Sequence, residues 1–225
     1  MNKCDISALT SILHLSTKYE LPHIRYQTIA ALSEIIPLSL SAWDKAHNTY
    51  WSNASERPSS DVLFRLANVC LQTGVKTILP PVLYLCTCLD MDTILNRKSN
   101  EKKPLVYLHH ANLFRVLIAR EKLSHMARSI TLRQIFFFEE CDDERCRSRM
   151  GKLARSLLLG PLSDGFIDPL TDPIASGGRR GLCQMCFESL QSSIARGRVE
   201  VWKGLAQVFG FGKQDAVRKD SDEHT

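Results

Sequence analysis

The stretch that decides the fold is Leu13-His-Leu-Ser-Thr-Lys-Tyr-Glu-Leu-Pro22-His-Ile-Arg25, which runs on to Ala31-Leu-Ser33. It predicts one amphipathic helix that ends near Tyr19, a tight break, and a second helix that begins at Pro22. Proline suits the first helical turn, because its missing N–H would have no partner there. Apolar residues recur at helical spacing along both segments. These are Ile6, Leu9, Ile12 and Leu13 with Ser16 on the first, and Ile24, Thr28, Ala31, Leu32 and Ile35 on the second.

Helical periodicity continues along most of the chain, and no stretch alternates long enough to predict a strand. Asp61 is expected to cap a helix that Gly74 ends, and Pro80-Pro81 to break the chain before the next one. Later helices are expected over residues 82–89, 112–138, 145–159 and 183–209.

The predicted fold is therefore all-α, an irregular array of about seven to nine helices. A zinc site with four cysteine ligands, described below, would hold part of this array together. We expect a helical segment over residues 1–95, a second over 105–211 and a disordered polar tail over 212–225.

Composition limits the function. The 225 residues are 44% hydrophobic and 24% charged, as in an ordinary soluble protein, and the net charge is +5. That charge is below what a dedicated nucleic-acid binder carries, so nucleic acid is not the expected partner. No apolar run reaches the roughly 20 residues that span a bilayer, so no membrane partner is expected either. Eight cysteines without a secretory signal predict an intracellular protein, nuclear or cytoplasmic, with thiols or metal ligands rather than disulfides.

Four cysteines form the most suggestive chemical pattern. Cys141-x4-Cys146 is followed, after 36 intervening residues, by Cys183-x2-Cys186. Two close pairs can bring four thiolates into a tetrahedron, which is how structural zinc is held. Metal ligation would stabilise the Gly- and Pro-rich connection between the pairs, since it offsets the entropy cost of closing that loop. The predicted metal ligands are these four cysteines, and the predicted cofactor is structural Zn²⁺.

Core packing is the alternative interpretation, and the sequence leaves both open. The spacing of the first pair is unusual for a zinc knuckle, and a buried cysteine is a common small apolar side chain. Cys146 is in helical register with Met150, Leu153, Ala154 and Leu157, and Cys183 with Phe187, Leu190 and Ile194. Three further cysteines lie within apolar helices and are expected in the core, namely Cys70, Cys86 and Cys88.

Several segments together resemble the BACK-like helical region that follows the last strand of a BTB/POZ domain in the large BTB-domain families of mushroom-type fungi. The resemblance covers residues 13–33, Trp43-Asp44, the Leu79-Pro-Pro-Val-Leu-Tyr-Leu-Cys86 block and the Leu113-Phe-Arg-Val-Leu segment. Near the C-terminus the matching residues are Cys141, Cys146, Cys183, Cys186, Arg198, Trp202, Phe209 and Gly210.

The resemblance implies a non-enzymatic protein–protein interaction module. In BTB proteins the BTB fold dimerises, and some members use the adjoining helices to engage cullin ubiquitin ligases. The segment from Ser11 to Leu32 would correspond to those helices. The BTB strands themselves have no counterpart here, so we expect a fragment or a divergent relative. The apolar face of Ile6, Leu9 and Leu13 would then lack its cover, which predicts self-association.

A second function stays open, that of a zinc-stabilised nucleic-acid-binding protein. Its basis is a basic set that comprises Arg145, Arg147, Arg149, Lys152, Arg155, Arg179, Arg180, Arg196 and Arg198. The simpler interpretation is a solvated face partly neutralised by Asp142, Asp143 and Glu144, because no aromatic residues or DNA-reading motif accompany the charges.

A cysteine-dependent enzyme is the third possibility, and no motif supports it. No spacing of histidine and cysteine indicates a nucleophile and its base. Gly210-Phe-Gly-Lys213 lacks the first glycine and the Ser/Thr of a phosphate loop. No catalytic residue is predicted.

Overall fold

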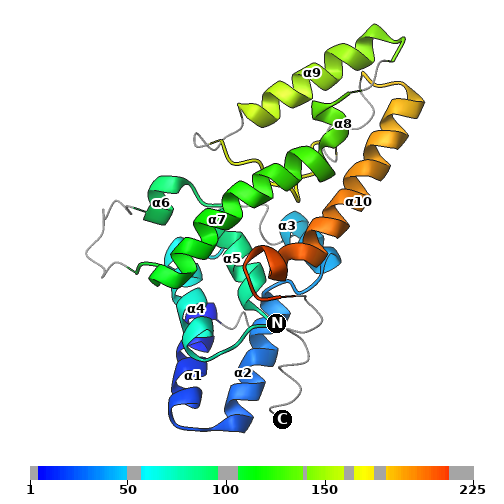
Figure 1. The fold of residues 1–225 in the computed structure, drawn as a ribbon. Helices are drawn as coiled ribbons and strands as arrows, with labels where there is room; N and C mark the ends of the chain where they lie inside the picture. The colour runs from blue at the N-terminus through cyan, green and yellow to red at the C-terminus, as the bar shows by residue number, and fades with distance from the viewer. Residues whose placement is uncertain are drawn as a thin grey trace. The chain divides into compact units, whose positions relative to one another are not determined.

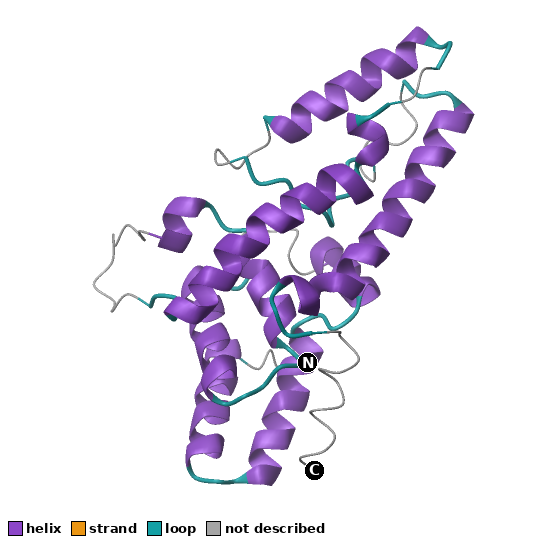
Figure 2. Ribbon diagram, viewed as in Figure 1, coloured by secondary structure: helices purple, strands orange, loops and turns teal. Residues whose placement is uncertain are grey.

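The computed structural model describes residues 5–49, 57–95, 106–138, 141–159, 165–174 and 181–212, and every regular element in these ranges is helical (Figure 2). The predicted all-α class is confirmed. Ten α-helices lie within the described ranges, one more than the upper end of the predicted number. None of these helices has the length and apolar character needed to cross a membrane. The predicted segment boundary near residues 96–104 lies outside the described residues, as does all of the predicted tail over 212–225 except its first residue.

Two compact units divide the chain. The first unit contains Met1–Ile118 and Leu205–Thr225, and the second contains Ala119–Gly204. Two helices, α7 (His110–Met126) and α10 (Gln184–Val208), therefore begin in one unit and end in the other.

The first unit begins with the helix pair that the sequence predicts, α1 (Ile6–Lys18) and α2 (Pro22–Ile35), which form a helical hairpin (Figure 1). The Asp5 carboxylate caps α1 by accepting a hydrogen bond of 3.0 Å from the Ser7 amide. Glu20 turns the chain with a φ of +53°, and Pro22 stands at the start of α2 as expected.

The expectation of an uncovered face at Ile6, Leu9 and Leu13 is wrong. Helix α1 packs against both α2 and α4 (Ser60–Gln72), and Leu9 and Leu13 are buried while Ile6 is half-buried. The cover comes from α4, which lies far along the chain and which helical periodicity alone does not place.

The remaining helices of the first unit are α3 (Leu40–Thr49), α5 (Leu79–Thr87) and α6 (Met91–Leu95). Two local predictions at the ends of α4 and α5 need correction. The residue before α4 is Ser59, so Asp61 lies in the first turn and is not the cap. Pro80 and Pro81 lie in the first turn of α5 rather than breaking the chain, because that turn needs no N–H partners. Gly74, with a φ of +69°, follows α4 in the predicted left-handed conformation.

The second unit contains the later part of α7, a π-helical turn at Ala127–Thr131, α8 (Arg133–Phe136), α9 (Glu144–Leu158) and most of α10. The helix expected over residues 112–138 is therefore interrupted. At the interruption α10 approaches very closely, because a Cβ built on Gly197 would lie 2.5 Å from Thr131 Cα. Only glycine fits this crossing.

An apolar core fills the second unit. Its buried residues come from the π turn, from α8, α9 and α10, and from the segments at 165–174 and 181–182. They are Ala127, Leu132, Ile135, Cys146, Met150, Leu153, Ile167, Ile174, Leu182, Leu190 and Ile194. The side chain of Arg198 also ties α10 to the 165–174 segment, by donating from Nε to the Leu170 carbonyl at 2.9 Å.

Candidate metal centre

Both pairs of cysteines stand at the beginning of a helix. Asp143 caps α9 by accepting a hydrogen bond of 3.0 Å from the Arg145 amide, and Cys146 is the third residue of that helix. Cys183 immediately precedes α10, where its carbonyl accepts the Phe187 amide at 3.0 Å, and Cys186 is the third residue of α10. The two helices thus present a cysteine at equivalent positions.

This arrangement explains the unusual spacing of the first pair. In α10 the capping position is itself a cysteine, Cys183, so two residues separate it from Cys186. In α9 that position belongs to Asp143, so the second thiol comes from Cys141, two residues earlier. Four intervening residues are therefore compatible with the same site.

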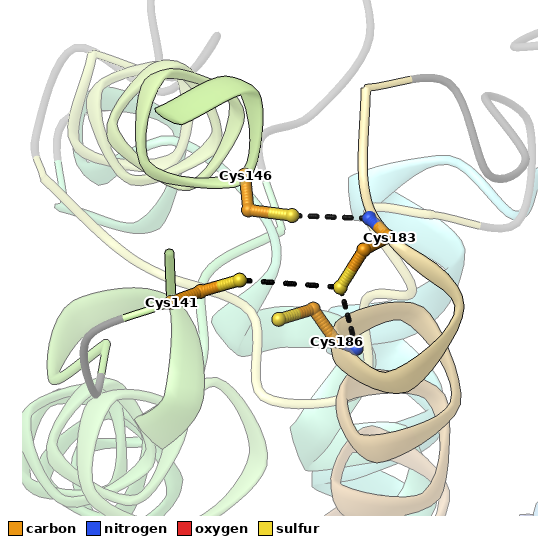
Figure 3. Close-up of side chains that lie close together, drawn as sticks. All are labelled: Cys141, Cys146, Cys183 and Cys186. Atoms are coloured by element: carbon orange, nitrogen blue, oxygen red, sulfur yellow. Dashed lines mark hydrogen bonds between the residues drawn. The ribbon is translucent and has the colours of Figure 1, made fainter. Parts of the chain in front are cut away.

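The four thiols converge on one point (Figure 3). Their Sγ atoms all lie within 4.8 Å of one another, and those of Cys141 and Cys183 are 4.0 Å apart. Zn–S bonds of about 2.3 Å in a tetrahedron place the sulfurs roughly 3.8 Å apart. The cysteines are free thiols, and 4.0 Å is far beyond the length of a disulfide bond, about 2.05 Å. The cluster therefore has the size of a tetrahedral zinc site.

Backbone amides donate to two of the sulfurs. The Cys183 amide donates to the Sγ of Cys146 at 3.0 Å, and the Cys186 amide donates to the Sγ of Cys183 at 3.4 Å. Figure 3 shows both contacts beside the Cys141–Cys183 approach. Amide donors and the positive ends of helices favour the thiolate form. The local backbone is thus arranged to stabilise negative charge on sulfur.

The pKa values of the thiols differ with their surroundings. The hydrogen bond from the Cys186 amide lowers the pKa of Cys183 to about 7. Burial raises the pKa of Cys146 and of Cys186 above the ordinary value. A coordinated metal ion deprotonates thiols outright, so it would supply the charge that burial otherwise disfavours.

Cys146 also lies on the buried face of α9, as its helical register with Met150 and Leu153 predicted. Cys146 is fully buried with Met150 and Leu153, whereas Cys141, Cys183 and Cys186 are half-buried and pack against the same core. The thiol cluster therefore closes one edge of the apolar core, and packing and metal ligation use the same side chains.

The other cysteines lie apart from this cluster. Cys70 and Cys86 are fully buried in the first unit, where burial raises the pKa of both thiols, and Cys88 is half-buried. Cys4 lies outside the described residues. Among the residues that the structure describes, the four clustered cysteines are the group of potential metal ligands that converges on one point.

Asp90 and the adjacent histidines His109 and His110 are further polar residues whose side chains make local contacts. Asp90 is used at the start of α6, where its two carboxylate oxygens accept the Thr93 amide at 2.8 Å and the Thr93 hydroxyl at 2.6 Å. The ring centroids of His109 and His110 lie 4.1 Å apart, with the ring planes tilted by 40°, on an exposed part of the chain.

The basic set is divided by the structure. Arg145, Arg147, Arg149, Lys152 and Arg155 all lie on α9, and Arg196 and Arg198 lie on α10. Arg179 and Arg180 lie outside the described residues. Sequence reasoning missed Asp143 as the residue that organises the start of α9, although an aspartate before an amphipathic run is a recognised capping signal.

The fold and the site together describe an all-helical protein in which four thiols lie within 4.8 Å of one another. Comparisons with protein-family models, with curated proteins and with solved structures find no match to this chain. What the chain does is therefore inferred from its thiol geometry and its surfaces.

Proposed function

We propose that this protein binds one structural Zn²⁺ ion through Cys141, Cys146, Cys183 and Cys186 and acts as a non-enzymatic helical interaction module. The observation that carries the metal assignment is the convergence of four free thiols within 4.8 Å, with amide donors to two of them. Four protein ligands leave no open coordination position, which is the pattern of structural rather than catalytic zinc.

The ion would join two parts of the second unit that are distant in sequence. One is the segment 141–146 at the start of α9, and the other is the Cys183-x2-Cys186 start of α10. Ligation would fix the two helix ends against the same apolar core and offset the entropy of closing the connection between them.

Cobalt titration tests the metal assignment with a spectroscopic readout. Co²⁺ prefers the same tetrahedral thiolate environment as zinc, and sulfur-to-cobalt charge transfer reports each thiolate ligand directly. We expect saturation at about one Co²⁺ per chain, and a fall in affinity of at least tenfold for Cys186→Ser, because one ligand is lost.

The matched control for this titration is Cys88→Ser, because Cys88 is a half-buried cysteine outside the cluster. It should bind cobalt like the unmodified chain. The proposed site would be contradicted if folded protein showed no thiolate–cobalt band, or if Cys186→Ser and Cys88→Ser lost the same amount of cobalt affinity.

The interaction function is supported by an apolar stripe on α1. Ile12, Leu15 and the C-cap residue Tyr19 recur at helical spacing along one flank of the packed side, and they are 40%, 48% and 63% exposed. We call these three residues the α1 stripe. Contiguous exposed apolar surface commonly marks a protein-binding site, and residues at this spacing suit a helix that docks into a groove.

The proposed location of the partner site follows the resemblance drawn from the sequence. Residues 11–32 resemble the helices that adjoin a BTB domain, and some members of that family use such helices to engage cullin ubiquitin ligases. A ubiquitin-ligase scaffold in the nucleus or cytoplasm is therefore the proposed partner class.

The α1 stripe can be tested by variant-dependent binding to a purified cullin N-terminal region. We expect Leu15→Glu/Tyr19→Glu to weaken binding at least tenfold, because two apolar anchors would become charged. Val199→Glu, at an exposed valine on α10, should leave binding unchanged. Absence of binding by the unmodified chain would refute this partner class without affecting the metal assignment.

A further inference from the structure

The solvent face of α9 carries a concentration of positive charge. Glu144 is the only acidic residue on the helix, whereas five of its residues are basic. Four of these cations are exposed, and we call them the α9 basic face. They are Arg145, Arg147, Lys152 and Arg155.

Direct ion pairing neutralises only one member of this face. Asp143 binds Arg145 through two side-chain hydrogen bonds of 3.1 Å, and this contact raises the pKa of the guanidinium. Among the residues that the structure describes, Arg147, Lys152 and Arg155 have no ion-pair partner. The neutralisation expected from the acidic run before α9 therefore does not extend along the helix.

Lys152 and Arg155 are three positions apart on one side of the helix, whereas Arg147 lies toward the flank of that side. The opposite face of the helix is buried in the core through Cys146, Met150 and Leu153. Small exposed residues stand between the cations, and a Cβ added to Gly151 would meet nothing within 4 Å. A ligand can therefore approach the helix closely between the charged side chains.

The composition of this face discriminates between classes of partner. Between Glu144 and Ser156 the exposed side chains are charged or small, and the exposed apolar side chains of α9 are confined to its C-terminal end, at Leu158 and Leu159. A protein interface is normally centred on apolar or aromatic anchors, and single-stranded nucleic acid is normally bound by aromatic stacking. The phosphate backbone of a duplex needs neither, because Lys and Arg alone bind it.

We propose that the α9 basic face binds the phosphate backbone of double-stranded nucleic acid without sequence preference. The proposal goes beyond the structural zinc site, although the folded second unit is what displays the helix. Guanidinium groups suit this role because their planar fork of N–H donors matches phosphate oxygens.

Fluorescence anisotropy with a labelled mixed-sequence DNA duplex of about 20 base pairs tests the proposal on the full, zinc-loaded chain. Three unpaired cations predict a slope of about −2.7 for log K against log salt. Lys152→Gln/Arg155→Gln should weaken binding at least tenfold at low salt and bring the slope to about −1.

The control, Lys122→Gln/Arg133→Gln, removes the same charge from exposed positions of the second unit outside α9. It should bind like the unmodified chain, and circular dichroism and metal content should be equal in all three proteins. The proposal is overturned if the chain does not bind the duplex at low salt, or if both double variants lose the same amount of duplex affinity. It is also overturned if the chain binds poly-glutamate of matched charge as tightly as the duplex. The last result would assign the face to an acidic protein instead.

Discussion

Removal of the proposed zinc ion is expected to unfold much of the second unit while the α1, α2 and α4 packing of the first unit persists. The four proposed ligands all belong to the second unit, and they close one edge of its core. A ligand present at 1,000 times its Kd contributes about 4 kcal/mol to folding. For a unit of this size that corresponds to a fall in Tm of roughly 15–30 °C.

Hydrogen exchange with and without a zinc chelator measures this effect unit by unit. Amides in α9 and in the first turns of α10 should lose protection on chelation, whereas amides in α1 and α4 should keep it. Cys183→Ser/Cys186→Ser should reproduce the chelator result, and Cys88→Ser should not. Unchanged protection of α9 in metal-free protein would show that apolar packing alone holds the unit.

Gly197→Ala will destabilise the second unit by about 3 kcal/mol or more, at the upper end of the cost of overpacking. The added Cβ would lie 2.5 Å from Thr131 Cα and 2.9 Å from Thr131 N. Both contacts are with backbone, so no side-chain rotation can relieve them, and α10 must move away from the π turn.

Gly151→Ala is the matched control for the crossing glycine. It makes the same substitution inside α9, where the new Cβ meets nothing within 4 Å. Alanine is favoured over glycine in a helix interior by about 1 kcal/mol, so this variant should be more stable. Chemical denaturation followed by circular dichroism compares the two. A Gly197→Ala variant as stable as Gly151→Ala would refute the close crossing.

The local features of the fold were predictable from the sequence. Pro22 at a helix start and Gly74 at a helix end act within a few residues, and each is found where predicted. The apolar spacing of the first helix correctly gives Leu9 and Leu13 as buried, but Ile12, expected on the same face, is 40% exposed. The long helix over residues 183–209 was also predicted to within a residue or so at each end.

Features that depend on distant contacts were not predictable. The π turn at Ala127–Thr131 lies against a glycine some 66 positions later, and the burial of Leu9 and Leu13 depends on α4. The error at Asp61 has a local cause, because neighbouring Ser59 and Asp61 are both good capping residues and only one can precede the helix.

The candidate site was predictable from the sequence only in part. Paired spacing identified the four cysteines, yet the same spacing allowed core packing, and only the three-dimensional structure places all four Sγ atoms within 4.8 Å. The role of Asp143 then accounts for the spacing that weakened the sequence-based argument.

Metal content per chain tests the central claim most directly. The chain would be purified under reducing conditions without a metal-affinity tag and subjected to elemental analysis, with circular dichroism to establish that it is folded. The four-thiolate site predicts about one zinc per chain, lost in Cys183→Ser/Cys186→Ser and retained in Cys88→Ser. Folded protein without bound metal, and with no uptake of added zinc, would contradict the account and leave the four cysteines as core thiols.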